Sequence, residues 1–414
     1  MGKNEHQDRL YRRCAYSFPF IFRYSMDGTL CPLMNLVTSD MMKTKLEKLK
    51  TIGEIMIDTG FRGKSYGWER IKIRDPETGV IYLQLTNAPV NSQVLYFEHQ
   101  NFTSDNQSVL FLSQRFASRN SGWDLFRVSV DGTNLVQLTD EEYSLGSPIP
   151  SPNKARSIYG VRKNSLLLLD IDTFEEQEIA RCQEVSGLGP STMTGDGKYY
   201  LACASSKADS TRMIVRFRTD GSEIATFAHG YPHNHLTVNY HGTILAFNGR
   251  DGEYTCGING ENLHKISDEQ QFAHCMWHGQ TNLRQGTLLP PGHAIATAEV
   301  DDIEKTIICN GPYFWHSASS RDGQWIISDT NWPDQGLILI HVTSGRYTTL
   351  VNPKSKIGHQ DITHPHPSFN WDNNMVVFCS NQTGLSQVYV CEIPDEIRNE
   401  LETGNLNYRL RWQK

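Results

Sequence analysis

Hydrophobic and polar positions recur along this chain with a loose period of about 40–45 residues, the length of one β-propeller blade. Each unit opens with an apolar or histidine-containing segment, passes through a turn rich in Asp, Asn or Gly, and continues into further apolar strands. One unit, residues 316–351, reads HSASSRDGQWIISDTNWPDQGLILIHVTSGRYTTLV. Alternation such as LFRVSV at 125–130 is typical of half-buried strands, and Gly, Asn and Asp suit tight hairpins. Seven such units predict an all-β fold, a seven-bladed β-propeller.

Two segments lie outside the repeat. Residues 68–89, WERIKIRDPETGVIYLQLTNAP, have the pattern of two strands around a turn, and we expect them to supply outer strands to the last blade and close the ring. Residues 36–56 have a helical pattern with Ser39 or Asp40 as N-cap. The expected organisation is therefore an N-terminal extension, residues 1–64, partly helical or disordered, followed by a propeller over residues 65–414.

Composition narrows the class of protein. The formal net charge is −7 and no stripe of Lys and Arg appears, which argues against a nucleic-acid partner. No apolar run approaches the ~18 residues of a membrane span, so no membrane partner is expected. Nine cysteines without CxxC spacing, and no recognisable secretory signal, predict reduced thiols and a cytoplasmic location. The sequence leaves the oligomeric state open, with a homodimer among the options.

Histidines recur at the starts of four consecutive units. His235 opens the fourth, His274 the fifth and His316 the sixth, while His364 and His366 open the seventh within THPHPSF. A single histidine at a strand start is usually just a satisfied polar residue. The first strand of each blade lines the central channel, however, so histidines at these places converge although they are distant in sequence. Three imidazoles and one oxygen suit Zn²⁺, Mn²⁺, Fe²⁺ or Ni²⁺. The oxygen ligand is expected from Asp361, with Gln360 as the alternative.

The segment ITHPHPSFNWDNNMVVFCSN resembles the C-terminal blade of the oligogalacturonate lyases of polysaccharide lyase family 22, which are seven-bladed propellers. WHSASSRDG around His316 and AHCMW around His274 are similar to segments of the preceding blades in that family. The resemblance covers roughly residues 68–397. It implies one divalent metal, Mn²⁺ in the first place, with Zn²⁺, Fe²⁺, Ni²⁺ or Ca²⁺ as alternatives.

By motif, the resemblance implies metal ligands at His316, His364 and His366, with Asp361 where the family has Gln. It implies a catalytic base at His274, for which His235 and His278 are rivals. The family's substrate-binding Arg has no match in the shorter segment FNGRDGEYTC, where Arg250 can substitute as a catalytic residue. Residues expected to bind substrate are the following: His235, Arg284, Arg321 and Trp277.

The implied reaction is β-elimination on short acidic oligosaccharides of 4-linked uronate, giving 4,5-unsaturated products. A metal and Arg side chains can offset the charge of the uronate carboxylate, while a neutral His near its usual pKa of ~6.5 removes the C5 proton. The altered fourth blade keeps a second reading open, a lyase for another uronate such as glucuronate or iduronate. A third is a propeller without catalysis that binds a protein or a glycan.

Overall fold

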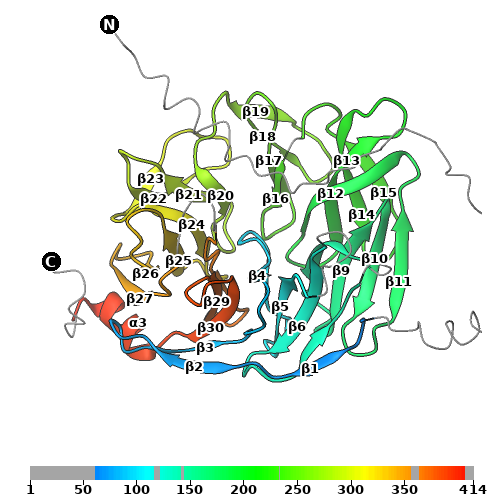
Figure 1. Cartoon of the computed structure of the whole chain (residues 1–414). Helices are drawn as coiled ribbons and strands as arrows, with labels where there is room; N and C mark the ends of the chain where they lie inside the picture. The colour runs from blue at the N-terminus through cyan, green and yellow to red at the C-terminus, as the bar shows by residue number, and fades with distance from the viewer. Residues whose placement is uncertain (1–60, 116–121, 141–143, 233, 356–362, 406–414) are drawn as a thin grey trace, which may run out of the picture. The chain divides into compact units, whose positions relative to one another are not determined.

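The computed structural model describes residues 61–115, 122–140, 144–232, 234–355 and 363–405, and the fold is given for these. Seven antiparallel sheets stand in a ring, each with its first strand toward the centre, as Figure 1 shows. The predicted seven-bladed β-propeller is confirmed. Because the first strands of neighbouring blades contact one another, side chains at their starts face a common axis.

The first three blades are built from consecutive antiparallel strands. From the centre outward, the first contains β4 (Ser92–Val94), β5 (Ser108–Ser113), β6 (Asp124–Ser129), β7 (Leu135–Gln137) and β1 (Ser65–Gly67). The second contains β8 (Gly146–Pro150), β9 (Ser157–Arg162), β10 (Ser165–Asp170) and β11 (Glu176–Arg181). The third contains β12 (Val185–Met193), β13 (Tyr199–Ser206), β14 (Arg212–Arg218) and β15 (Ile224–Phe227).

The remaining four blades follow the same order. The fourth contains β16 (Asn234–Val238), β17 (Ile244–Asn248), β18 (Glu253–Gly257) and β19 (His264–Ser267). The fifth contains β20 (Ala273–Trp277), β21 (Arg284–Leu288), β22 (Ala294–Ala298) and β23 (Thr306–Asn310). The sixth contains β24 (Phe314–Ser319), β25 (Trp325–Thr330), β26 (Leu337–His341) and β27 (Tyr347–Val351). The seventh contains β28 (Ser368–Phe369), β29 (Met375–Ser380), β30 (Gln387–Glu392), β3 (Ile81–Gln84) and β2 (Ile71–Arg74).

The N-terminal strands belong to the two blades at the ends of the chain. Strand β1 pairs with β7 of the first blade, whereas β3 pairs with β30 of the seventh, and Figure 1 shows these strands in blue along one side of the ring. Thr86 donates its hydroxyl proton to Gln387 Oε1 at 2.7 Å, next to the backbone bond from Leu85 to Val388. The ring is thus closed by strands from both ends of the chain. The boundary at residue 64 and the helix expected for residues 36–56 stay predictions, because residues 1–60 lie outside the described part.

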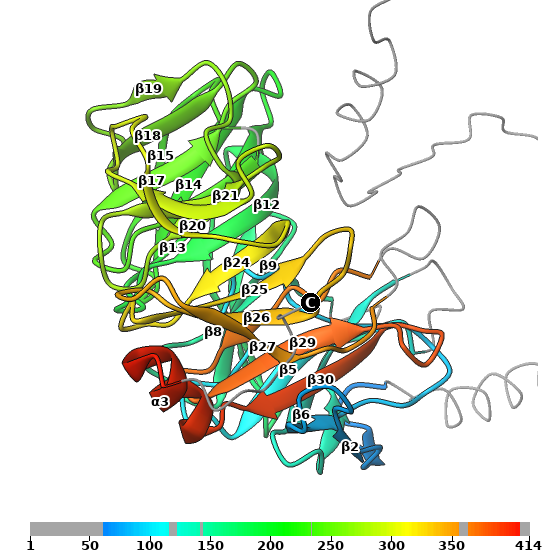
Figure 2. The same ribbon diagram turned by 90° about the vertical axis from the view of Figure 1, so that its left-hand side faces the viewer.

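The core lies between the sheets, since each sheet has a blade on both sides. Adjacent residues of β25 show this: Ile326 and Ile327 point to opposite faces, are fully buried, and belong to different hydrophobic clusters. Burying one such side chain contributes about 1.5–3 kcal/mol. Helix α3 (Asp395–Thr403) lies beside β26 and β27 (Figures 1 and 2) and buries Ile397 and Leu401, one turn apart.

Two smaller expectations concern the thiols and the membrane. The seven cysteines of the described residues are all free, and six of them are buried. No helix in this part of the chain has the length and apolar character needed to cross a membrane.

Candidate functional site

The innermost strands are irregular where the histidines occur. Backbone φ is positive at His235 (51°), His274 (55°) and His366 (46°). Such values are uncommon for residues other than glycine and persist where the surroundings fix them. The register of strand pairing breaks at these places, between Asn234 and Thr237 in β16, between Ala273 and Met276 in β20, and between Phe314 and Ser317 in β24. A β-bulge re-aims the side chain beside it, so these starts can direct histidines toward the axis.

Four histidines from three blades are brought together by this geometry. The ring centre of His316 lies 4.1 Å from those of His274 and His366, and 5.2 Å from that of His364. Trp315 stacks on His364, with ring centres 6.1 Å apart and planes 27° apart. The residues singled out at the starts of the fifth, sixth and seventh units therefore form one cluster.

Asp329, on β25, is a member of this cluster that the sequence analysis missed. Its carboxylate is fully buried and accepts the His316 backbone N–H at 2.6 Å, His316 Nδ1 at 3.0 Å and the His366 backbone N–H at 3.2 Å. His316, Asp329 and His364 offer ligand atoms within 4.8 Å of one another. Because both oxygens of Asp329 already accept hydrogen bonds, we interpret it as the group that orients His316 and leaves Nε2 free.

Burial keeps the clustered imidazoles neutral. Desolvation, followed by the repulsion of neighbouring imidazoles, holds the pKa values of His274, His316 and His366 well below the usual value. Burial also lowers the pKa of His364. Burial raises the pKa of Asp329 to about 6. Neutral imidazoles have the free lone pair that a metal ligand needs.

The residues present fit a divalent metal ion. For metal–nitrogen distances of ~2.1 Å, imidazole centres around one ion lie roughly 4.5–5.2 Å apart. The three pairs among His316, His364 and His366 have separations of 4.1, 5.2 and 5.9 Å, so one lies at the upper end of that range, one below it and one above it. In addition, Nδ1 of His364 is buried and has no hydrogen-bond partner among the described residues. The oxygen ligands considered from the sequence, Asp361 and Gln360, lie outside the described residues.

A loop of the first blade, residues 95–101, supplies two further polar groups. Tyr96 Oη lies 3.2 Å from Nδ1 of His274, and Glu98 Oε1 lies 2.8 Å from Nδ1 of His235. Asn101 anchors the loop: its Oδ1 accepts the Leu95 N–H at 2.7 Å, and its Nδ2 donates to Ser368 on β28 at 2.7 Å. The loop thus joins the first blade to the histidine segment of the seventh.

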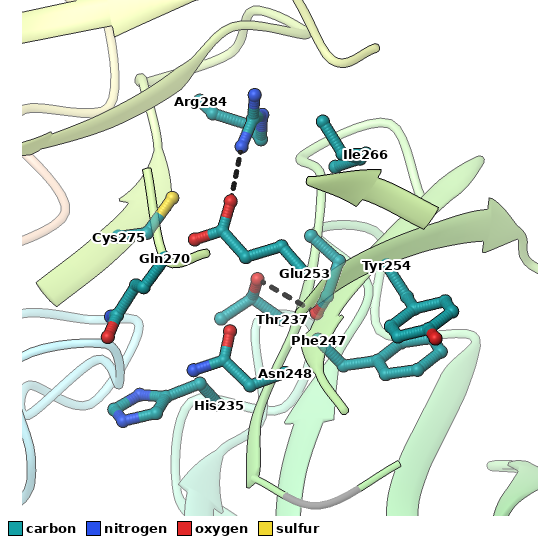
Figure 3. Close-up of a pocket in the computed structure, with 11 residues that line it drawn as sticks. His235, Thr237, Phe247, Asn248, Glu253, Tyr254, Ile266, Gln270, Cys275 and Arg284 are labelled. Atoms are coloured by element: carbon teal, nitrogen blue, oxygen red, sulfur yellow. Dashed lines mark hydrogen bonds and ion pairs between the residues drawn. The ribbon is translucent and has the colours of Figure 1, made fainter. Parts of the chain in front are cut away.

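His235 lies beside the histidine cluster, at the edge of a pocket between the fourth and fifth blades. Asn248, Glu253, Cys275 and Arg284 also line this pocket (Figure 3). Burial alone would lower the pKa of His235, but the Glu98 carboxylate outweighs burial, so the pKa of His235 is raised.

Two residues expected to bind substrate are engaged inside the fold. Arg284 is 1% exposed, and its guanidinium donates to Glu253 at 3.0 Å and to the Asp302 carbonyl at 2.6 Å; Figure 3 shows it turned toward Glu253. Trp277 is buried, three residues after His274 and hence ~10 Å further along the strand. The contacts of Arg284 indicate a structural role, although it also lines the pocket beside His235, and the substrate contacts expected for both residues stay predictions.

Two further predicted residues lie at the end of the channel opposite to the histidine cluster. His316 is near the start of β24, where Phe314 pairs with Thr330. Arg321 lies in the turn after the other end of this strand and donates to Tyr240 Oη at 2.6 Å. The rival base His278 is also at the far end of its strand, buried against Gln285 at 2.8 Å.

Arg250 is better placed. It follows β17, whose last residue Asn248 pairs with Asn234 at the start of β16, so it lies at the same end as His235. Its side chain is exposed and has no ion-pair partner within the described ranges. Arg250 remains the candidate catalytic arginine, and the substrate contact expected for Arg321, at the other end of its strand, stays a prediction.

Comparison with known proteins supports the architecture. No family model matches the chain. The oligogalacturonate lyase of Dickeya dadantii (strain 3937) is 19% identical over 402 residues, covering 81% of this chain and 99% of the relative. The oligogalacturonide lyase of Pectobacterium atrosepticum is 22% identical over 399 residues, covering 79% and 96%. A solved oligogalacturonate lyase in complex with manganese matches with a TM-score of 0.69 at 19% identity, over 81% of this chain and 99% of that one. At these identities the structural likeness shows that the chain shares the seven-bladed propeller fold.

Proposed function

We propose that this protein is a metal-dependent lyase that cleaves short uronate oligosaccharides, of the oligogalacturonate type, by β-elimination. The observation that carries the proposal is a cluster of neutral imidazoles at the channel axis, in which His316 is buried and the others are half-buried, beside a further histidine that a tyrosine contacts. The similarity over nearly the whole length of two oligogalacturonate lyases supports the substrate class.

In this proposal His316, His364 and His366 hold the ion, with Asp361 as the fourth ligand from the sequence. A bound divalent ion would offset the negative charge that develops on the uronate carboxylate as the C5 proton leaves. Manganese is the proposed ion, because the similar lyase structure was solved with it. Asp329 fixes the orientation of His316, and both of these side chains are shielded from solvent.

His274 serves as the proposed base. Its lowered pKa leaves it neutral at physiological pH, and its ring lies against the metal cluster without any contact to Asp329 among the described residues. When Nδ1 carries the ring proton and donates it to Tyr96 Oη, the lone pair of Nε2 is free to take the C5 proton. The exposed Arg250 at the same end of the channel is positioned to meet the carboxylate of a bound uronate.

The test is direct. Purified protein supplied with Mn²⁺ is incubated with oligogalacturonates, and the ultraviolet absorbance of the 4,5-unsaturated product is followed. A chelator-treated sample and His274→Ala serve as controls, and both should lack product.

The two alternative readings have their own outcomes. Product from a glucuronate or iduronate oligomer in a substrate panel would identify another uronate as the substrate. This alternative is worth testing because Arg284 and Arg321, two arginines expected to bind galacturonate, are hydrogen-bonded to other side chains of the protein. Binding of an oligomer without product from any member of the panel would instead indicate a propeller that only binds.

A further inference from the structure

Two histidines of the channel lie outside the proposed ligand set and occupy equivalent places in neighbouring blades. His235 is the second residue of β16 and His274 the second residue of β20. Both have positive φ, and strand pairing is irregular beside both. Tyr96 contacts each of them: its hydroxyl reaches His274, and its ring centre lies 6.1 Å from that of His235. The two imidazoles therefore face the same space from two blades.

Their partners differ in charge. His235 Nδ1 faces the carboxylate of Glu98 at 2.8 Å, in an ion pair whose side chains are 32% and 8% exposed. His274 faces a neutral phenol. The Glu98 carboxylate therefore favours the protonated form of His235 and raises its pKa. An imidazole whose Nδ1 faces a carboxylate is suited to donate a proton, whereas one beside a phenol lacks that support and is suited to accept one.

We infer that His235 is the general acid of the reaction, donating its Nε2 proton to the glycosidic oxygen that leaves C4. This inference rests on the proposed function. In the step, His274 takes the C5 proton, and the electrons of the C–H bond form the C4–C5 double bond. The C4–O bond breaks with its electron pair on oxygen, and that oxygen takes the proton of His235. Glu98 holds the Nδ1 proton and stabilises the imidazolium before the transfer.

Sugar stereochemistry supports two separate residues. In a 4-linked galacturonate the C5 hydrogen and the C4 oxygen point to opposite faces of the ring, so one group cannot serve both. Tyr96 is the obvious rival acid, but its hydroxyl lies 3.2 Å from Nδ1 of the base and is thus engaged with the base, although its ring also faces His235.

The experiment compares two substrates. One is an oligogalacturonate, whose leaving alkoxide needs a proton; the other is a galacturonate carrying dinitrophenolate at C4, a leaving group stable as an anion. We expect His235→Gln to slow the oligogalacturonate at least about a hundredfold while changing the aryl substrate by less than about threefold. His274→Gln should lose both activities. Metal content and melting temperature of each variant are measured alongside.

A second variant keeps the test open if His235→Gln folds poorly. Glu98→Gln removes the carboxylate, so the alkaline limb of the pH–rate profile for the oligogalacturonate should move to lower pH, with no such limb for the aryl substrate. Asp268→Asn, which removes an exposed carboxylate after β19, is the matched control and should leave the profile unchanged. Equal losses on both substrates, or none, would overturn the acid role of His235. A wild type inactive on both substrates would instead refute the proposed function.

Discussion

Replacing Asp329 by Asn tests whether a buried carboxylate sets the geometry of the proposed ion site. The side chain accepts three hydrogen bonds, two of them from His316. An amide of the same shape keeps one accepting oxygen and puts an NH₂ group in place of the other. If that NH₂ group faces Nδ1 of His316, it donates a hydrogen bond to this nitrogen. Nδ1 must then accept, so the ring proton moves to Nε2. The nitrogen assigned to the ion then lacks its lone pair.

The magnitude follows from the bond that is lost. A hydrogen bond to a charged group contributes about 1.5–3 kcal/mol, which corresponds to roughly 10- to 150-fold in Kd. Outer partners of metal-bound histidines typically change metal affinity by about 10- to 100-fold. We therefore expect Asp329→Asn to weaken Mn²⁺ or Zn²⁺ binding within this range.

The assay is competition against a chromophoric chelator at fixed pH, with metal-free unfolding measured in parallel. Asp334→Asn is the matched control, because Asp334 lies in the same blade and accepts from Gly336 and Thr330 without touching a histidine. Unchanged affinity in a folded Asp329→Asn protein would refute the orienting role. A loss as large as that of His316→Ala would make Asp329 a ligand itself.

The remaining predictions address the other parts of the site. His364→Ala should abolish most metal binding, measured by elemental analysis after dialysis; unchanged occupancy would remove His364 from the ligand set. His274→Ala should keep the metal and lose turnover at least about a hundredfold; loss of the metal would instead make it a ligand. Arg250→Ala should raise KM in steady-state kinetics, whereas Arg321→Ala should not, and the reverse result would exchange their roles. The free energy of unfolding of metal-free protein should be highest above pH ~6.5 and fall below it, because the unfolded chain protonates imidazoles that the fold keeps neutral. Denaturant titrations across pH would show the opposite slope if the raised pKa values of His235 and Asp329 outweighed the lowered ones. Among the described residues the lowered imidazole pKa values belong to the following: His99, His274, His316, His364 and His366.

The fold and part of the site could be predicted from the sequence because both depend on local patterns. The period of the strands predicted seven blades, and histidines at unit starts meet at the axis because a propeller brings those starts together. Asp329 does leave a signal in the sequence, a charge within the apolar segment WIISDT, which forms the next strand of the unit that His316 opens.

Other features had no local signal. Tyr96 and His274 are 178 residues apart in sequence, and no pattern near either residue names the other. The side-chain directions of Arg284 and Arg321 depend on which end of a strand they occupy and on partners such as Glu253 and Tyr240. All three residues are arginines expected near the channel, so residue type alone could not distinguish Arg284 and Arg321 from the exposed Arg250.

The strands that close the ring also have a consequence for synthesis on the ribosome. Strands β2 and β3 emerge early, yet β3 pairs with β30, and the bond between Thr86 and Gln387 spans 301 residues. Until the last blade emerges, these early strands present unpaired edges, a state that favours association with other chains. Contacts of this sequence separation also form slowly. His364 and His366 arrive with the same late blade, so a nascent chain cannot hold the proposed ion before its ring can close. A circularly permuted chain that begins at the seventh blade would make those contacts early, and would separate the timing of ion capture from the timing of closure.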